Sequence, residues 1–159
     1  MCVALHTKLD RDGLPHSFHC IRVCMTQTEE PRMIAALLHD VLEDCGMHHR
    51  AEIEREFGHR IALTVDFLTR AKEQTWSSYI KQVMEDEHPK GRWYVLSADH
   101  LVRRRAHEDA MHIKMADIED NVSPRRLDEK MRKQLPMYHE AYMKIARRLG
   151  YTDKVLPLI

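Results

Sequence analysis

Apolar side chains recur at helical spacing in one segment of the chain after another. One such stripe is made of four residues spaced three or four apart, namely Met111, Met115, Ile118 and Val122. A repeat of this kind is typical of amphipathic helices that bury one face. The 159 residues include only five glycines and six prolines, too few for a linker-rich or disordered chain. We therefore expect an all-α fold, with residues 1–159 forming a single domain.

Prolines and glycines indicate where the expected helices begin and end. Pro15 is predicted to open a first helix, whose apolar residues are Phe18, Ile21 and Met25. Pro31 is predicted to open a second helix that Gly46 ends. Further helices are expected over about 50–57, 61–72, 75–87 and 108–122, followed by a last helix that ends at Gly150 and that Pro136 either starts or kinks. Residues 88–93 are predicted to form a loop, and the run 93–96 to enter the next helix.

Charge and cysteine content limit the classes of partner. The chain has 25 basic and 25 acidic residues, whereas a protein that binds nucleic acid generally needs a strong basic excess. No apolar run reaches membrane-spanning length, and no signal-peptide pattern follows the start. The cysteines form no CxxC pair, which argues against a zinc ribbon; they are Cys2, Cys20, Cys24 and Cys45. We expect a cytoplasmic protein with reduced thiols and no general nucleic-acid or membrane partner.

The octet at residues 37–44 places four polar side chains in an aliphatic setting. The polar members are His39, Asp40, Glu43 and Asp44, and the others are leucines and a valine. On a continuous helix, residues four apart share a face, so the four would emerge from one surface. Burying so many unpaired polar groups would cost several kcal/mol. An adjacent His-Asp pair can ligate a metal ion, and a Glu-Asp pair one turn later can transfer protons.

Two other expected helices add polar groups to this set. The first contributes His19, and the helix near residue 115 contributes Lys114, Asp117 and Asn121, whose spacing puts them on one face. Two imidazoles and two carboxylates suit manganese, iron, zinc or nickel better than calcium. A structural interpretation stays open on spacing alone, because a single histidine on an apolar face is more often a core residue with its own partners.

Together these residues resemble the HD-domain metal-dependent phosphohydrolases, and more narrowly the hydrolase domain of the Rel/SpoT alarmone enzymes and their small single-domain relatives. Residues 13–19 are similar to the opening Gly-x-Pro-Tyr-x-x-His, and residues 38–44 match Leu-His-Asp-x-x-Glu-Asp. Residues 114–121 match Lys-Leu-Ala-Asp-x-x-x-Asn with a methionine for the leucine. Glu56, Phe57 and Gly58, then Val65, Asp66 and Thr69, resemble the helices between them. The resemblance covers nearly the whole chain and implies an HD-type helical bundle.

The resemblance implies a role for each matched residue. One divalent ion, expected to be manganese, would be held by His19, His39, Asp40 and Asp117. Glu43 and Asp44 would position and deprotonate the attacking water. The substrate would be contacted by Arg11, Lys72, Lys114 and Asn121. Lysines near a cleaved phosphate ester would stabilise its spreading negative charge.

These roles predict a metal-dependent phosphohydrolase acting on a small nucleotide-type substrate. In its specific form, the enzyme would remove the 3′-pyrophosphate from guanosine tetra- or pentaphosphate. The chain departs from the family pattern at three positions, where His16 replaces a tyrosine, Cys20 a proline and Ile118 an arginine. Two alternatives therefore stay open: a nucleotidase or phosphatase for another phosphorylated metabolite, and a non-catalytic nucleotide-binding module. A second ion on the remaining histidines is not favoured by their spacing; these are His48, His49, His59 and His88.

Overall fold

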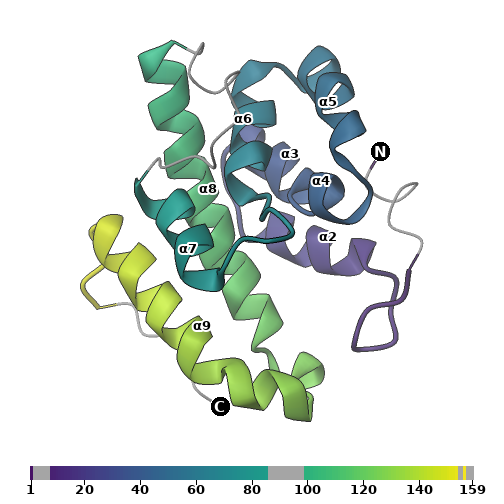
Figure 1. The fold of residues 1–159 in the computed structure, drawn as a ribbon, viewed down its shortest axis with the longest axis vertical. Coiled ribbons are helices and arrows are strands. Elements are labelled where there is room, and N and C mark those ends of the chain that lie inside the picture. Colours follow the sequence, from purple (N-terminus) through teal and green to yellow (C-terminus); the bar gives the residue numbers. More distant parts are fainter. Residues whose placement is uncertain (2–7, 86–98, 154–155, 157–159) are drawn as a thin grey trace.

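The computed structural model describes residues 1, 8–85, 99–153 and 156. In these residues the chain forms helices joined by short loops (Figure 1). The helices are α2 (Ser17–Met25), α3 (Glu30–Leu38), α4 (Val41–Asp44), α5 (Arg50–Phe57), α6 (His59–Leu68), α7 (Trp76–Glu85), α8 (His100–Asn121) and α9 (Glu129–Arg148), with 3-10 turns η1 (Met47–His49) and η3 (Pro124–Arg126). The only β pairing in the described residues is one isolated bridge between Leu9 and Pro15. The predicted all-α helical bundle is confirmed.

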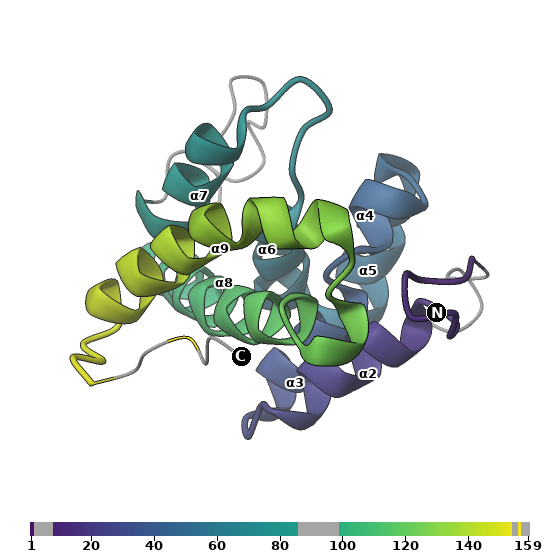
Figure 2. The ribbon, with the colours of Figure 1, turned by 90° about the horizontal axis from the view of Figure 1, so that it is seen from below.

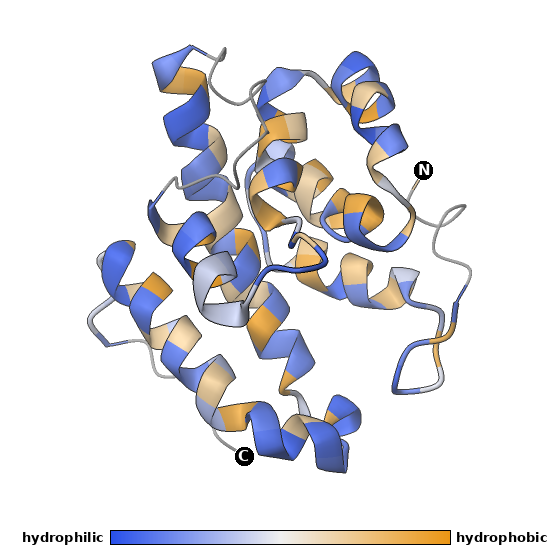
Figure 3. Ribbon diagram, in the orientation of Figure 1, coloured by the Kyte–Doolittle hydropathy of each residue, from blue (hydrophilic) through white to orange (hydrophobic). Residues whose placement is uncertain are grey.

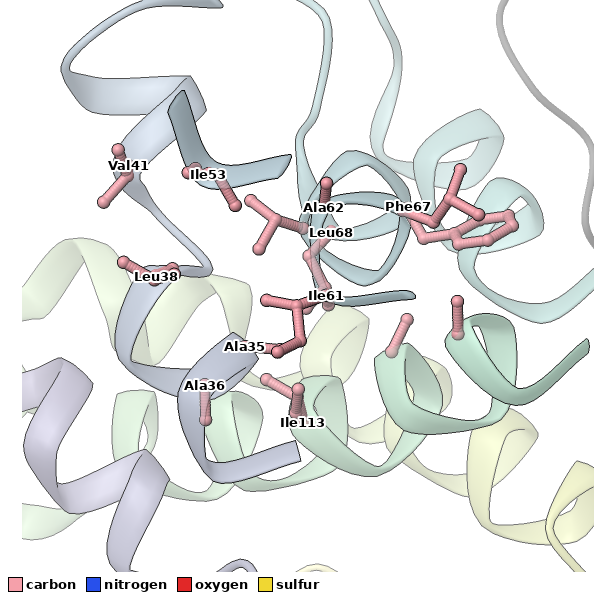
Figure 4. Close-up of a cluster of buried hydrophobic side chains, with 14 of the residues drawn as sticks. Ala35, Ala36, Leu38, Val41, Ile53, Ile61, Ala62, Phe67, Leu68 and Ile113 are labelled. Atoms are coloured by element: carbon pink, nitrogen blue, oxygen red, sulfur yellow. The ribbon is translucent and has the colours of Figure 1, made fainter. Parts of the chain in front are cut away.

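Helix α8 runs through the middle of the bundle. Helices α2, α3 and α6 pack against one side of it, and α7 and α9 against the other (Figures 1 and 2). Hydrophobic and hydrophilic residues alternate along the helices, as in amphipathic helices (Figure 3). One apolar cluster, which includes Ile53, Phe67 and Ile113, fills the first side (Figure 4). A second cluster, which includes Tyr142 and Ile145, fills the other.

Helix α2 turns a different face to the interior from the predicted one. Phe18 is 48% exposed and Met25 is 77% exposed, so the predicted apolar stripe is not the buried face. The buried face carries His19, Cys20 and Val23 instead. The prediction was wrong because it assumed that the largest apolar residues face the core, whereas this helix buries a histidine. Pro15 also lies two residues before the helix rather than at its first position.

The octet is not a continuous helix. Helix α3 ends at Leu38, the backbone turns at His39 and Asp40, and α4 begins at Val41. Asp40 has φ −95° and ψ −5°, away from ideal helical values, so a helix running unbroken from Pro31 to Gly46 was a wrong prediction. Pro31 does lie in the first turn of α3, as expected. The His-Asp pair therefore lies at a corner between two helices.

The remaining boundaries follow the prediction with some shifts. Gly58 ends α5 with a positive φ of 87°, as its position suggested. Helix α6 ends at Leu68 rather than near 72, and α8 begins at His100 rather than near 108, where Asp99 caps it by accepting from two backbone N–H groups. Pro136 lies inside α9 and does not start it. The predicted loop at 88–93 and the run 93–96 fall outside the described residues.

In the part of the chain described above, no helix has the length and apolar character needed to cross a membrane.

Candidate metal centre

Three parts of the fold bring the four predicted metal ligands together. His19 comes from α2, His39 and Asp40 from the corner between α3 and α4, and Asp117 from α8. The Nε2 atom of His19 lies 3.1 Å from Oδ1 of Asp117 and 3.7 Å from Oδ2 of Asp40. The Nε2 atom of His39 lies 3.2 Å from Oδ2 of Asp40 and 3.9 Å from Oδ1 of Asp117. Each of the two histidine nitrogens thus lies 3.1–3.9 Å from an oxygen of both carboxylates.

Each of the two imidazoles is held by an acceptor on its outer side. Nδ1 of His39 donates to the backbone carbonyl of Ala36 at 2.7 Å, and Nδ1 of His19 pairs with Oδ2 of Asp120 at 2.8 Å. Such outer partners fix the tautomer and point the Nε2 lone pair at a metal. Nε2 of His39 is buried and has no hydrogen-bond partner. A buried nitrogen left without a partner is costly, and a divalent ion in this N₂O₂ set would satisfy it.

The electrostatic environment of the four ligands favours a cation. Burial would raise the pKa of Asp117, but the Lys114 ammonium and the nearby imidazoles hold it well below its usual range. Burial likewise disfavours the charged form of His39, yet Asp40 and Asp117 outweigh it and raise its pKa to about 9. A site whose carboxylates stabilise positive charge on an adjacent imidazole also stabilises a bound metal ion.

A cavity of about 270 Å³ opens from the metal ligands. Three of the predicted ligands line it, namely His19, Asp40 and Asp117. Its other lining residues include the three arginines Arg11, Arg70 and Arg126 and the three aromatic residues Trp76, Tyr79 and Tyr138. The ring centroids of Trp76 and Tyr138 are 5.0 Å apart. Cations next to a metal site suit phosphate groups, and aromatic rings suit a planar base.

The two predicted catalytic carboxylates occupy different positions. Glu43 lines the cavity, and its Oε2 atom accepts the backbone N–H of Arg70 at 3.1 Å. Burial raises the pKa of Glu43, which favours proton transfer near neutral pH. Asp44 is not among the residues that line this cavity, its side chain is 47% exposed, and its Oδ2 atom lies 3.5 Å from Nε2 of His16. Glu43 is therefore the better placed of the two to act on a water in the cavity.

Three of the four predicted substrate residues line the same cavity. Arg11 donates to the side-chain oxygen of Asn121 at 2.5 Å, and Asn121 donates to Oδ1 of Asp117 at 2.5 Å. Lys114 is buried, and its ammonium lies 2.6 Å from Oδ2 of Asp117 and 4.8 Å from the ring centroid of Tyr79. Lys114 is thus neutralised by a metal ligand.

Lys72 does not lie with the metal ligands. It lines a neighbouring cavity of about 510 Å³, together with Leu42, Met47 and Thr69. Glu43 and Arg70 line both cavities, so the two adjoin at the predicted general base. A substrate that reaches Lys72 would have to extend past Glu43.

The sequence interpretation assigned no role to several side chains at the site, and His16 and Asp120 are two of them. His16, noted only as a departure from the family pattern, pairs with Oδ2 of Asp40 at 2.8 Å. Asp120 holds His19 and also accepts from Arg22 at 2.6 Å and from Arg126 at 3.2 Å. Their spacing was a usable signal, because His16 precedes His19 by three residues and Asp120 follows Asp117 by three, which puts each pair on one helix face.

The remaining histidines stay apart from this centre. The described groups of His, Cys, Asp and Glu that are close enough to share an ion do not include His48, His49 or His59. His59 pairs instead with Glu54 at 2.5 Å. His88 falls outside the described residues.

Comparison with known proteins found similarity among solved structures. Neither the known protein families nor the curated proteins matched this sequence. Among solved structures, the chain is similar to a metazoan ortholog of SpoT, described as hydrolysing ppGpp and playing a role in starvation responses, with a TM-score of 0.60 and 24% sequence identity. The similarity covers 98% of this chain and 84% of that chain. At this level of identity the similarity shows that the two proteins share a fold.

Proposed function

We propose that the protein is a divalent-metal-dependent phosphohydrolase that removes the 3′-pyrophosphate from guanosine tetra- or pentaphosphate. The observation that carries this proposal is the convergence of His19, His39, Asp40 and Asp117 on one point, beside a cavity that Glu43 also lines. Further support comes from the SpoT ortholog that shares the fold and hydrolyses ppGpp.

The four ligands would hold one ion, with manganese the proposed metal. When bound, the ion would polarise a phosphoryl oxygen and lower the pKa of a bound water. Glu43 would take the proton of that water, because burial raises its pKa and makes its carboxylate a stronger base than an exposed glutamate. The backbone N–H of Arg70 holds the Glu43 carboxylate at 3.1 Å and so orients it.

The two cavities would divide the substrate between them. Arg11 and Arg70 would neutralise phosphate charge at the mouth of the metal site, and Trp76 with Tyr138 would stack on a planar base. Lys72, in the adjoining cavity, would contact a second phosphate group. Glu43 lies where the two cavities meet, with Arg11 lining one cavity and Lys72 the other. A substrate with phosphates at two positions of one nucleoside fits this arrangement, because each cavity offers a cation to one of the phosphate groups.

We also place the protein in the cytoplasm. The described cysteines, Cys20, Cys24 and Cys45, form no disulfide, which is usual in a reducing compartment.

The direct test is to incubate the manganese-loaded protein with guanosine tetraphosphate and to measure the pyrophosphate released. The expected result is release by the parent protein and none by a His39→Ala variant. Absence of release by the parent protein would overturn the specific substrate. A nucleotide screen with phosphate detection would then identify a phosphatase for another metabolite. Nucleotide binding without any turnover would instead identify a non-catalytic module.

A further inference from the structure

His16 gives the centre a third imidazole that is arranged like the other two. Its Nε2 atom points inward and lies 2.8 Å from Oδ2 of Asp40. Its Nδ1 atom lies 3.3 Å from Oδ2 of Asp10, which parallels the pairing of His19 with Asp120. A carboxylate behind the outer nitrogen is the usual companion of a metal-binding histidine. His16 is therefore oriented as a ligand.

Cys20 places a thiol beside this imidazole. It lies one helical turn beyond His16 on α2, so the two side chains share a face. Cys20 is completely buried, and its sulfur belongs to a group with His16 and Asp40 whose ligand atoms all lie within 4.8 Å of one another. Asp44 adds a carboxylate 3.5 Å from Nε2 of His16. One imidazole, one thiol and two carboxylates thus lie close together at Asp40.

We propose that His16, Cys20 and Asp40 form a second divalent-metal site, with Asp44 as a fourth donor, so that Asp40 bridges two ions. This inference builds on the first ion site of the proposed function. The Oδ2 atom of Asp40 lies 3.2 Å from Nε2 of His39 and 2.8 Å from Nε2 of His16, so this carboxylate is close to a nitrogen of each group. Paired ions about 3.5–4 Å apart can stabilise both the attacking and the leaving oxygen of a phosphoryl displacement.

The two sites differ in the metals they would select. The first offers two nitrogens and two oxygens, whereas the second includes a sulfur. Thiolate ligands favour zinc, iron or cobalt over magnesium, calcium or manganese. We therefore expect zinc or cobalt to fill both sites, and manganese to fill mainly the first.

The first test counts bound metal. The full chain is stripped with a chelator, saturated with zinc, and analysed by mass spectrometry after removal of free ions. We expect about two ions per chain in the parent protein and about one in Cys20→Ala. The matched control is Cys24→Ala, because Cys24 is also buried on α2, one turn further along, and does not belong to the ligand group. It should retain about two ions.

The second test detects the thiolate bond itself. Cobalt bound to a cysteine sulfur gives a charge-transfer absorption in the near ultraviolet. The parent protein and Cys24→Ala should show this absorption, and Cys20→Ala should lose it. If Cys20→Ala does not fold, His16→Gln serves in its place, because His16 is partly exposed and its replacement leaves the core intact. It should bind about one zinc ion.

The outcomes separate this inference from the proposed function. One ion in both the parent protein and Cys20→Ala, or a cobalt spectrum without the thiolate absorption, overturns the second site even if guanosine tetraphosphate is hydrolysed. Two ions and the absorption, without hydrolysis of any nucleotide, support the second site and overturn the proposed function.

Discussion

Each histidine of the proposed first metal site is held by a partner on its Nδ1 atom. Asp120 accepts from His19 at 2.8 Å and from Arg22 at 2.6 Å, so it ties the α2 ligand to α8. Replacing Asp120 with asparagine would remove the charge and free the ring to change tautomer. We expect Asp120→Asn to weaken metal binding by about 10- to 100-fold.

A competition titration against a coloured chelator would measure this loss. The exposed Glu140, which pairs with Lys144 on the surface, provides the control variant Glu140→Gln. Equal metal affinity in the Asp120→Asn and parent proteins would show that Asp120 does not contribute to metal binding.

The pH dependence of the reaction should report Glu43. A base must be deprotonated to act, and burial, with the Asp40 charge adding to it, raises the pKa of Glu43 above the ordinary 4.5. Activity should therefore fall as the pH decreases through the raised pKa of Glu43. This fall should occur at a higher pH than it would for a glutamate with an ordinary pKa. Glu43→Gln should lower kcat by about 10²- to 10⁴-fold and remove this limb of the profile of kcat/KM against pH. A limb at the same pH in the variant would assign the titration to another group.

The family resemblance singled out His19, His39, Asp40 and Asp117 in the sequence, and the structure brings these four side chains close together. The spacing of His16 from His19 was a signal of a shared helix face, but the sequence did not reveal the partners of His16. The meaning of His16 depends on Asp40 and Asp10, which approach it only through the corner at residues 39–40 and through the N-terminal loop. Lys72 was predicted to be a site residue, but it lines a separate cavity, and its position in the sequence gave no sign of this.

At the scale of the helices, the sequence predicted helix ends and buried faces correctly where a glycine or a clear apolar stripe marked them. Gly58 marks the real end of α5, and the apolar stripe of Met111, Met115 and Ile118 is buried as expected. The break within the octet left no such signal, because leucines and valine continue the helical pattern across it. The basic start of α8 was missed since its first turns expose arginines rather than apolar residues.

Helix α9 provides a prediction at this scale. Its start is fixed by Asp128, whose side chain accepts the backbone N–H of Met131 at 2.6 Å. Removing such a cap costs about 1 kcal/mol. We expect Asp128→Ala to lower the free energy of unfolding by that amount in a denaturant titration. The variant Asp128→Ser keeps a capping oxygen and should recover most of the loss, so equal losses in both variants would contradict the capping role.

At the scale of the whole molecule, the metal centre joins elements that are far apart in the sequence. Its ligands come from α2, from the corner before α4, and from α8, the helix that separates the two apolar clusters. An ion bound here would stabilise the folded chain, because the unfolded chain cannot hold these four ligands together. At a free ion concentration of about 100 times Kd, the stabilisation is about 2.7 kcal/mol.

This stabilisation predicts how the melting temperature responds to metal. Adding manganese to chelator-treated protein should raise Tm by roughly 5–10 °C for a chain of this size. The variant His39→Ala should show no comparable rise, because it removes one nitrogen ligand and leaves Asp40 and Asp117 without their central partner. Differential scanning calorimetry with increasing metal measures both. A Tm of the parent protein that stays constant up to saturating manganese would mean that the four side chains do not bind the ion together, whatever the activity in nucleotide assays.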